Sequence, residues 1–155
     1  IGFANTWSEE GYEADDQIAT ACEVIADQGD NAVIVGTDGD LLQLLSSSTI
    51  IWNPTKKKTT TADSFRSEWG IEPSQWADVK AIAGCGTDDV VGVKGVGEKT
   101  AVKFLTGKLK PTTKAFASII QSTDLWKLNL PIVRLPFEGI QKKEIQPDEV
   151  TQQRW

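Results

Sequence analysis

Apolar residues in the first third of the chain change from a helical to a strand-like spacing. Within residues 11–29, Ile18 and Ile25 stand two helical turns apart with further apolar residues between them, which predicts an amphipathic helix. The β-branched run at residues 31–38 predicts a buried parallel strand. Because a short helical pattern follows at residues 39–47, the order of elements indicates an α/β fold.

The rest of the chain is predicted to form one more strand, followed mainly by helices. Residues 48–61 contain this strand and a basic, threonine-rich hairpin or loop that follows it. A helix beginning at a Thr61 or Asp63 cap is expected to end at Gly70. The last fifteen residues are polar and are expected to fray. Further helices are expected at residues 75–84, 98–105, 114–122 and 124–135.

A glycine-rich segment lies between two of these helices. Glycine turns expose backbone N–H groups, and the first turn of a helix leaves its own N–H groups unpaired, so together they can bind a phosphate. Spaced glycines also occur in plain connections between core helices. Residues 92–100 come within one residue of a nucleotide-binding P-loop, but that loop needs a preceding strand, and here a helix is expected. We therefore favour a helix, glycine hairpin and helix that hold a nucleic-acid backbone without reading its bases.

Charge is unevenly distributed around a net charge of −6. Residues 1–55 hold ten acidic residues and no lysine or arginine, whereas residues 94–114 hold six lysines and Glu98. An enzyme acting on a polyphosphate needs acids that hold cations and lysines that hold the backbone. Chance segregation on a solvated surface would give the same pattern.

Composition excludes several other classes of protein. Two cysteines without a CxxC pair argue against a disulfide framework or a zinc site and suit a reducing cytoplasm. No apolar run approaches the length of a membrane span. The chain contains no histidine, so a histidine general base is excluded within it and the activation of water would depend on a metal.

Carboxylates gather at three boundaries between the predicted elements. Helix-dipole interactions and an ordinary Asp-Gly turn account for some of them. All three groups together predict binding of hard divalent cations, which prefer oxygen ligands. The groups are Glu13, Asp15 and Asp16; Asp38 and Asp40; and Asp88 and Asp89.

Taken in order, the motifs YEADD, TDGDLLQLL and TDDVVGVKGVGEKTAVKFL resemble those of the 5′ nucleases, the flap endonucleases and 5′ to 3′ exonucleases. The resemblance implies an α/β fold with the C-terminal part of a PIN-like nuclease core at residues 1–70. A helix-hairpin-helix DNA-binding element would follow at residues 71–110, and a helical C-terminal extension at residues 111–155. The implied activity is metal-dependent hydrolysis of DNA phosphodiesters by a cytoplasmic monomer, with duplex or flapped DNA as partner and selectivity for DNA structure.

The resemblance also assigns functional residues by position. It implies two or three Mg²⁺ or Mn²⁺ ions in the acidic site and a K⁺ ion at the helix-hairpin-helix. The implied catalytic residues are Asp15, Asp16, Asp38 and Asp40. The implied metal ligands are Glu13, Asp15, Asp16, Asp38, Asp40 and Asp88. The implied DNA contacts are Gly92, Gly95, Gly97, Lys99 and Lys103.

Departures from the family pattern bear on activity. Cys85 stands where the family has an acid and is a candidate lost metal ligand, while Asp89 stands where the family often has asparagine. The family's N-terminal portion, with its first-strand aspartate and basic arch, is absent. We therefore expect a fragment of a longer polypeptide that cuts DNA weakly or not at all alone. The alternatives are a structure-selective DNA-binding protein of the same fold without catalysis, and the P-loop nucleotide binder.

Overall fold

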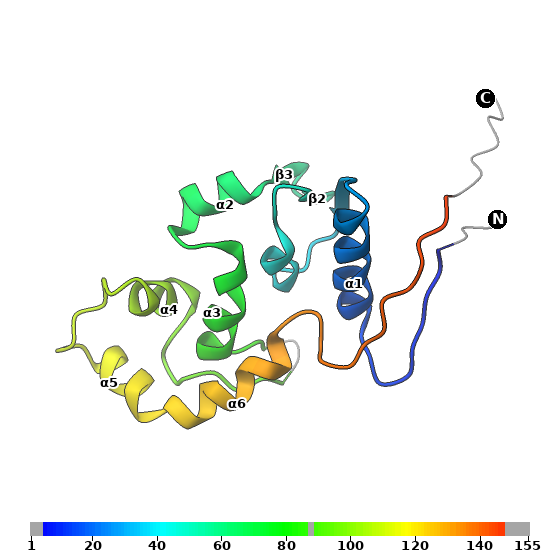
Figure 1. Ribbon diagram of the computed structural model, residues 1–155. Helices are drawn as coiled ribbons and strands as arrows, with labels where there is room; N and C mark the ends of the chain where they lie inside the picture. Colours follow the sequence, from blue (N-terminus) through cyan, green and yellow to red (C-terminus); the bar gives the residue numbers. More distant parts are fainter. Residues whose placement is uncertain (1–4, 87–88, 148–155) are drawn as a thin grey trace.

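The computed structural model describes residues 5–86 and 89–147, which form a small sheet followed by a series of helices (Figure 1). The three-stranded sheet has the order β1-β2-β3, with β1 parallel to β2 and β2 antiparallel to β3. The elements occur in the predicted order. The strands are β1 (Ala32–Val35), β2 (Thr49–Asn53) and β3 (Lys58–Thr60). The helices are α1 (Ala14–Asp27), η1 (Asp40–Leu44), α2 (Ala62–Trp69), η2 (Pro73–Gln75), α3 (Trp76–Ala83), α4 (Glu98–Leu105), α5 (Lys114–Gln121) and α6 (Thr123–Val133).

Local signals explain where helix α2 begins and ends. The hydroxyl of Thr61 accepts a hydrogen bond from the backbone N–H of Ser64 at 3.1 Å, so Thr61 rather than Asp63 is the cap. The helix ends at Gly70, whose φ of 71° is readily adopted only by glycine. Both predicted boundaries of this helix are confirmed.

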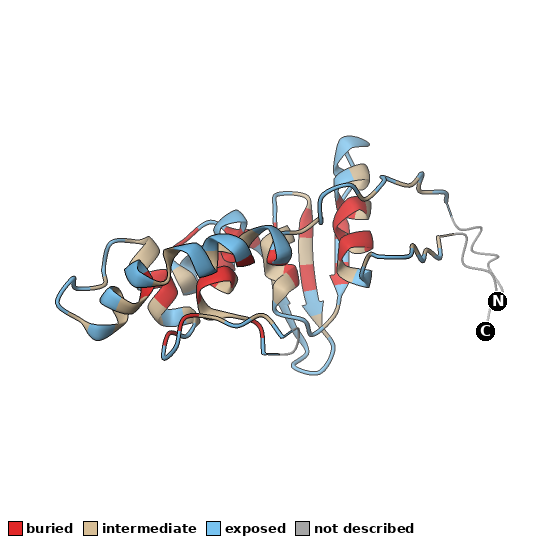
Figure 2. Ribbon diagram, turned by 90° about the horizontal axis from the view of Figure 1, so that it is seen from below, coloured by how far each residue is buried: buried red, intermediate tan, exposed pale blue. Residues whose placement is uncertain are grey.

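Only one face of the sheet is covered in the described chain. Ala32 and Ile34 of β1 are buried on the side of α1, whereas Val33 and Val35 point the other way and are 58% and 64% exposed. Trp52 of β2 lies on the same open face and is 39% exposed. The prediction of a parallel strand is confirmed, but the predicted burial holds for one face only, because buried and exposed residues alternate along β1 (Figure 2).

The outer edge of β1 is open as well. Strand β1 ends the sheet, and its inner edge pairs with β2 through N–H groups of Ala32 and Gly36. Since backbone groups alternate along a strand, those of Val33 and Val35 point away from β2. The described sheet thus has both an uncovered face and an uncovered edge.

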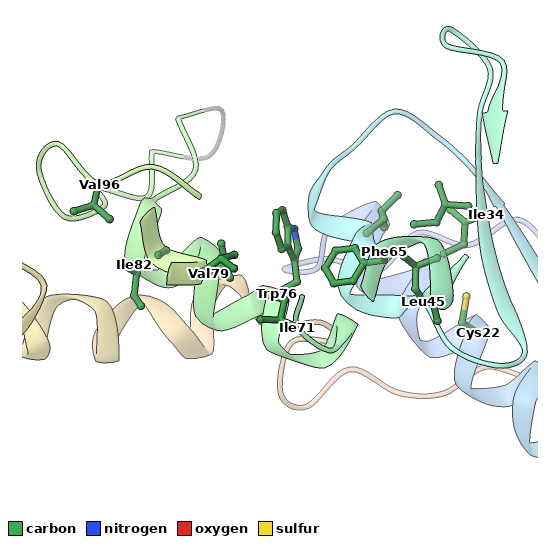
Figure 3. Close-up of a cluster of buried hydrophobic side chains, with 14 of the residues drawn as sticks. Cys22, Ile34, Leu45, Phe65, Ile71, Trp76, Val79, Ile82 and Val96 are labelled. Carbon is green, nitrogen blue, oxygen red and sulfur yellow. The ribbon is translucent and has the colours of Figure 1, made fainter. Parts of the chain in front are cut away.

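One apolar core extends from the sheet into the helices (Figure 3). Trp76 is its largest fully buried side chain, and its indole N–H donates to the carbonyl of Gly39 at 2.8 Å. Its ring meets those of Phe65 and Trp69 at centroid distances of 5.5 and 4.7 Å. The expected division at residues 70 and 110 stays a prediction.

Helix α6 is tied to α3 by a buried amide. The side chain of Asn129 donates to the carbonyl of Ala81 at 3.0 Å and to the carbonyl of Val91 at 2.9 Å. These bonds fix α6 against both the end of α3 and the segment leading to α4. No spacing in the sequence singles out Asn129, because both partners are distant along the chain.

Residues 141–147, which belong to the segment predicted to fray, have no regular secondary structure but contact the first half of the chain, and the other residues of that segment, 148–155, lie outside the described residues. Lys143 pairs with Glu9 at 2.8 Å, and Lys142 pairs with Glu23 and Asp27 of α1 at 3.0 and 3.3 Å. The negative charges of Glu9, Glu23 and Asp27 are therefore balanced by lysines and do not require a metal ion. No helix in the described ranges is long and apolar enough to cross a membrane.

Candidate metal and DNA site

The first acidic group and one member of the second meet in a pocket of about 250 Å³. The start of α1 contributes Glu13, Asp15 and Asp16, and the start of η1 contributes Asp40. Apolar side chains close the other side; they are Val90, Ile132, Val133, Leu135 and Phe137. The start of a helix and the carboxyl end of a strand thus converge, as expected for a ligand site in an open α/β sheet.

The neighbouring acids of α1 differ in their surroundings. Asp16 is buried, and its carboxylate accepts hydrogen bonds from the backbone N–H groups of Phe137 at 2.7 Å and Glu13 at 3.1 Å. Asp15 is half-buried, and burial followed by the negative charge of Asp16 raises its pKa above the ordinary value. A cation in the pocket would relieve the repulsion around Asp15.

Asp40 lies in a small ionic network. Its Oδ1 is 2.9 Å from the ammonium of Lys80, which is also 3.3 Å from Glu98 at the start of α4. Burial alone lowers the pKa of Lys80, but the hydrogen bond and charge of Asp40, with Cys85 and Glu98, raise it above its ordinary value overall. Lys80 therefore stays charged and links the acidic pocket to α4. No spacing in the sequence singles out Lys80, because its partners Asp40 and Glu98 are distant along the chain.

Cys85 borders the same network. Its side chain is buried, and its Sγ lies 3.5 Å from Oδ2 of Asp40. Cys85 also forms an isolated antiparallel bridge with Val90, which lines the pocket. The residue singled out as a possible lost ligand thus lies beside a predicted metal ligand.

The remaining predicted ligands are not gathered in this pocket. Asp38 is exposed, accepts a hydrogen bond from the N–H of Asp40 at 2.9 Å, and lines a different cavity with Lys56 and Lys58. Asp88 lies outside the described residues, and Asp89 is exposed with a φ of 53°. Residues two apart in a tight turn point in different directions, which explains why Asp38 and Asp40 separate.

The donor set of the pocket suits a hard divalent cation. Oδ1 of Asp40 is buried, and the charged group that it meets within the described residues is the Lys80 ammonium, 2.9 Å away. Glu13, Asp15 and Asp40 offer oxygen atoms only, as Mg²⁺ and Mn²⁺ prefer. The described ranges contain no ready-made group of three or more acidic or cysteine side chains that could hold an ion. Binding would therefore require these side chains to draw together.

The glycine segment between α3 and α4 has two distinct parts. A Cβ at Gly92 would overlap the backbone of Ala83 and Gly84, so Gly92 is required for close packing. Gly95, with a φ of 78°, and Gly97, which caps α4, are exposed with open space around them. Because helix α3 precedes the segment, the strand that a P-loop requires is not present there.

Lysines on α4 face a groove. Lys99 and Lys103 are exposed and line a groove of about 370 Å³ between α2 and α4. Lys108, Trp69 and Glu68 line it too, and the sequence analysis did not single out Trp69. A basic groove containing an aromatic ring suits the contact of a nucleic-acid backbone.

Comparison with known proteins gives a consistent family. Residues 3–70 match the family described as 5'-3' exonuclease, N-terminal resolvase-like domain. The chain is 44% identical over 97 residues to a 5'-3' exonuclease of Halalkalibacterium halodurans, covering 61% of this chain and 32% of the relative. It is 41% identical over 109 residues to that of Bacillus subtilis, covering 68% of this chain and 34% of the relative. The chain thus spans about a third of the length of these relatives.

Solved structures agree with this comparison. A bacteriophage T5 5'-exonuclease described with bound divalent zinc superposes with a TM-score of 0.74 at 25% identity, covering 84% of this chain and 52% of that one. A T5 flap endonuclease described in complex with DNA and metal ions gives the same TM-score at 24% identity. On these matches and on the conjunction of acidic pocket and basic groove, the chain is a member of the 5′ nuclease family.

Proposed function

We propose that this chain supplies the metal-binding and DNA-binding part of a 5′ to 3′ exonuclease or flap endonuclease. The observation that carries the proposal is the pocket in which Glu13 and Asp15 meet Asp40. These three residues would hold a divalent ion, Mg²⁺ or Mn²⁺, with Asp38 and Asp88 as further proposed ligands. Such an ion supplies an activated water and charge stabilisation for phosphodiester hydrolysis.

The basic groove would hold the DNA. Lys99 and Lys103 are placed to contact phosphates, with Gly95 and Gly97 offering backbone N–H groups beside the start of α4. A K⁺ ion at this hairpin and a helix-hairpin-helix role for residues 71–110 remain part of the proposal. Lys80 would couple the two sites, because it contacts Asp40 of the pocket and Glu98 of α4.

Full activity is proposed to require more polypeptide than this chain. The open face of the sheet carries exposed Val33, Val35 and Trp52, although strands of α/β proteins are usually covered on both faces. The relatives are about three times as long as the part that matches. We therefore expect little or no cleavage by the 155-residue chain alone.

A chimeric nuclease tests the proposal. The matching stretch of the Bacillus subtilis relative is replaced by this chain, and cleavage of a 5′-flapped duplex is followed with Mg²⁺. We expect the chimera to cut in a Mg²⁺-dependent manner and the separate chain to cut at least about 100-fold more slowly. The unaltered relative serves as the control for substrate and conditions. A folded, DNA-binding chimera that never cuts would reject the nuclease proposal.

A DNA-binding protein without catalysis is the second candidate function. The observation that favours it is that Cys85 and Lys80 lie beside Asp40.

For either candidate, changing Lys99 and Lys103 together to alanine is expected to weaken duplex binding, because two phosphate contacts are lost. The slope of log affinity against log salt should become shallower by about two. Fluorescence anisotropy over a salt series measures both effects. Lys127→Ala, an exposed lysine on α6, should leave the slope unchanged, and an equal effect there would reject the groove.

Replacing Cys85 by aspartate tests the proposed lost ligand. A neutral thiol is a poor ligand for Mg²⁺ or Mn²⁺, and an added carboxylate beside Asp40 supplies a hard oxygen. We expect Mn²⁺ to bind several-fold more tightly in a calorimetric titration of the chimera. Cys22→Asp is the matched control for introducing a buried acid, and it should not raise Mn²⁺ affinity. Unchanged affinity in the folded Cys85→Asp variant would show that Cys85 does not border a metal site.

A further inference from the structure

Lys80 is one positive charge shared by two carboxylates from distant parts of the chain. Its ammonium lies 2.9 Å from Oδ1 of Asp40 in the acidic pocket and 3.3 Å from Oε1 of Glu98 at the start of α4. The side chains of Lys80 and Asp40 are only 13% and 15% exposed, whereas that of Glu98 is 41% exposed. A single ammonium cannot neutralise both carboxylates, so one negative charge is left over between the pocket and α4.

Glu98 places part of that charge where a phosphate is proposed to bind. It is the first residue of α4, directly after Gly97, which has no side chain to cap the helix. The start of a helix attracts one anion, and a carboxylate in its first turn repels a second one beside it. The next residue, Lys99, lines the basic groove. Any negative charge left on Glu98 therefore opposes DNA at the place where Lys99 favours it.

The packing of Lys80 limits where its ammonium can go. The side chain is largely buried on α3, which packs against both η1 and α4. If Asp40 no longer carries a free negative charge, turning the ammonium into solvent would pull the buried stem out of this packing. Glu98 is only 3.3 Å away and is already a partner. Lys80 is therefore expected to pair with Glu98 alone.

We propose that Lys80 is a shared counter-ion that makes DNA binding depend on the charge of Asp40. While Asp40 is a free carboxylate, it holds Lys80 and leaves Glu98 negative, so Glu98 repels DNA phosphates. Once the charge of Asp40 is balanced by an ion, Lys80 turns to Glu98, and the start of α4 accepts a phosphate. The inference rests on the proposed function and adds an order of binding, in which a filled pocket favours DNA. By linkage, DNA at α4 strengthens binding of the ion to the same extent.

Asp40→Asn tests the coupling without a metal, because it removes the same negative charge. In the 155-residue chain with a chelator present, this variant is expected to bind duplex DNA about fivefold more tightly than the unsubstituted chain. Fluorescence anisotropy of a labelled duplex measures the affinity. Asp78→Asn is the matched control, because Asp78 is a partly exposed acid of α3 that lines neither the acidic pocket nor the basic groove. It should change the affinity by less than about twofold.

A double-mutant cycle separates this coupling from a general effect of charge. Glu98→Gln alone is expected to tighten DNA binding about as much as Asp40→Asn does. Because both variants act through Lys80, the double variant should bind less than about twofold more tightly than either single variant. In a Lys80→Met background, Asp40→Asn should likewise change the affinity by less than about twofold. The cycle of Asp40 and Glu98 decides the inference if Lys80→Met does not fold.

Mn²⁺ tests the same coupling with the acidic pocket filled. The ratio of duplex affinities with and without Mn²⁺ should be about fivefold larger for the unsubstituted chain than for Glu98→Gln, in which no charge at α4 is left to neutralise. Free Mn²⁺ also screens the DNA, but this screening is the same for both proteins and cancels in the comparison.

The possible results separate the inference from the proposed function. Additive gains from Asp40→Asn and Glu98→Gln, or an equal gain from Asp78→Asn, would overturn the role of Lys80. An equal effect of Mn²⁺ on the unsubstituted chain and on Glu98→Gln would overturn the order of binding. If neither the chain nor the chimera binds Mn²⁺ in calorimetry, the proposed metal site fails, while the cycle without metal still decides whether Lys80 links Asp40 to DNA. A chain that binds no duplex even at low salt would reject the basic groove and this inference together.

Discussion

Asp40→Asn in the chimeric nuclease is expected to reduce Mg²⁺-dependent cleavage by at least about 100-fold. Asp40 lines the acidic pocket opposite Glu13 and Asp15 and has a buried oxygen that faces Lys80. An amide of the same shape removes the negative charge that would hold the ion. It also leaves the Lys80 ammonium without its nearest anion. Initial rates on a 5′-flapped duplex measure the effect.

The control for Asp40→Asn is the same substitution at Asp124. This acid is exposed on α6 and does not line the acidic pocket. Its cleavage rate should stay within about twofold of the unsubstituted chimera, since exposed surface changes have small effects. Comparable rates for Asp40→Asn and the unsubstituted chimera, with both folded, would remove Asp40 from the site.

Trp76→Ala is expected to lower the free energy of unfolding by about 4 kcal/mol. The indole is 1% exposed, packs against Phe65 and Trp69, and donates a hydrogen bond to Gly39 beside Asp40. Its removal leaves a cavity where the sheet and the helices share their core. Urea unfolding followed by circular dichroism measures the loss, and an unfolded variant would agree with it.

Trp52→Ala is the matched control, because Trp52 lies on the open face of the sheet and is 39% exposed. It should cost no more than about 1 kcal/mol in the same measurement, since much of the ring already contacts water. Equal losses at the two positions would show that Trp76 does not hold the core together.

Local patterns predict most of the elements because their causes are local. The spacing of Ile18 and Ile25 predicts helix α1, in which both side chains are partly buried against the core, and Gly70 ends α2 because only glycine adopts its φ readily. Acidic residues at element boundaries correctly indicate one pocket for the start of α1 and Asp40. For both helices the cause lies within a few residues of the position it explains.

The different surroundings of the neighbouring acids Asp15 and Asp16 could not be predicted in the same way. Spacing places Asp15 and Asp16 together, but the bond from Phe137 that distinguishes them spans 121 positions. The ion pair between Lys80 and Asp40 likewise depends on how α3 packs beside η1. Such pairings follow from tertiary packing, so the residues nearest in sequence carry no signal for them.

The open edge of β1 also affects how the chain behaves in solution. An uncovered strand next to a flat apolar face is a template on which a second strand can form hydrogen bonds. Val33 and Val35 carry no charge that would oppose such pairing. Concentrated preparations of the chain should therefore form reversible aggregates through β1, and a single lysine at position 33 or 35 should improve its solubility.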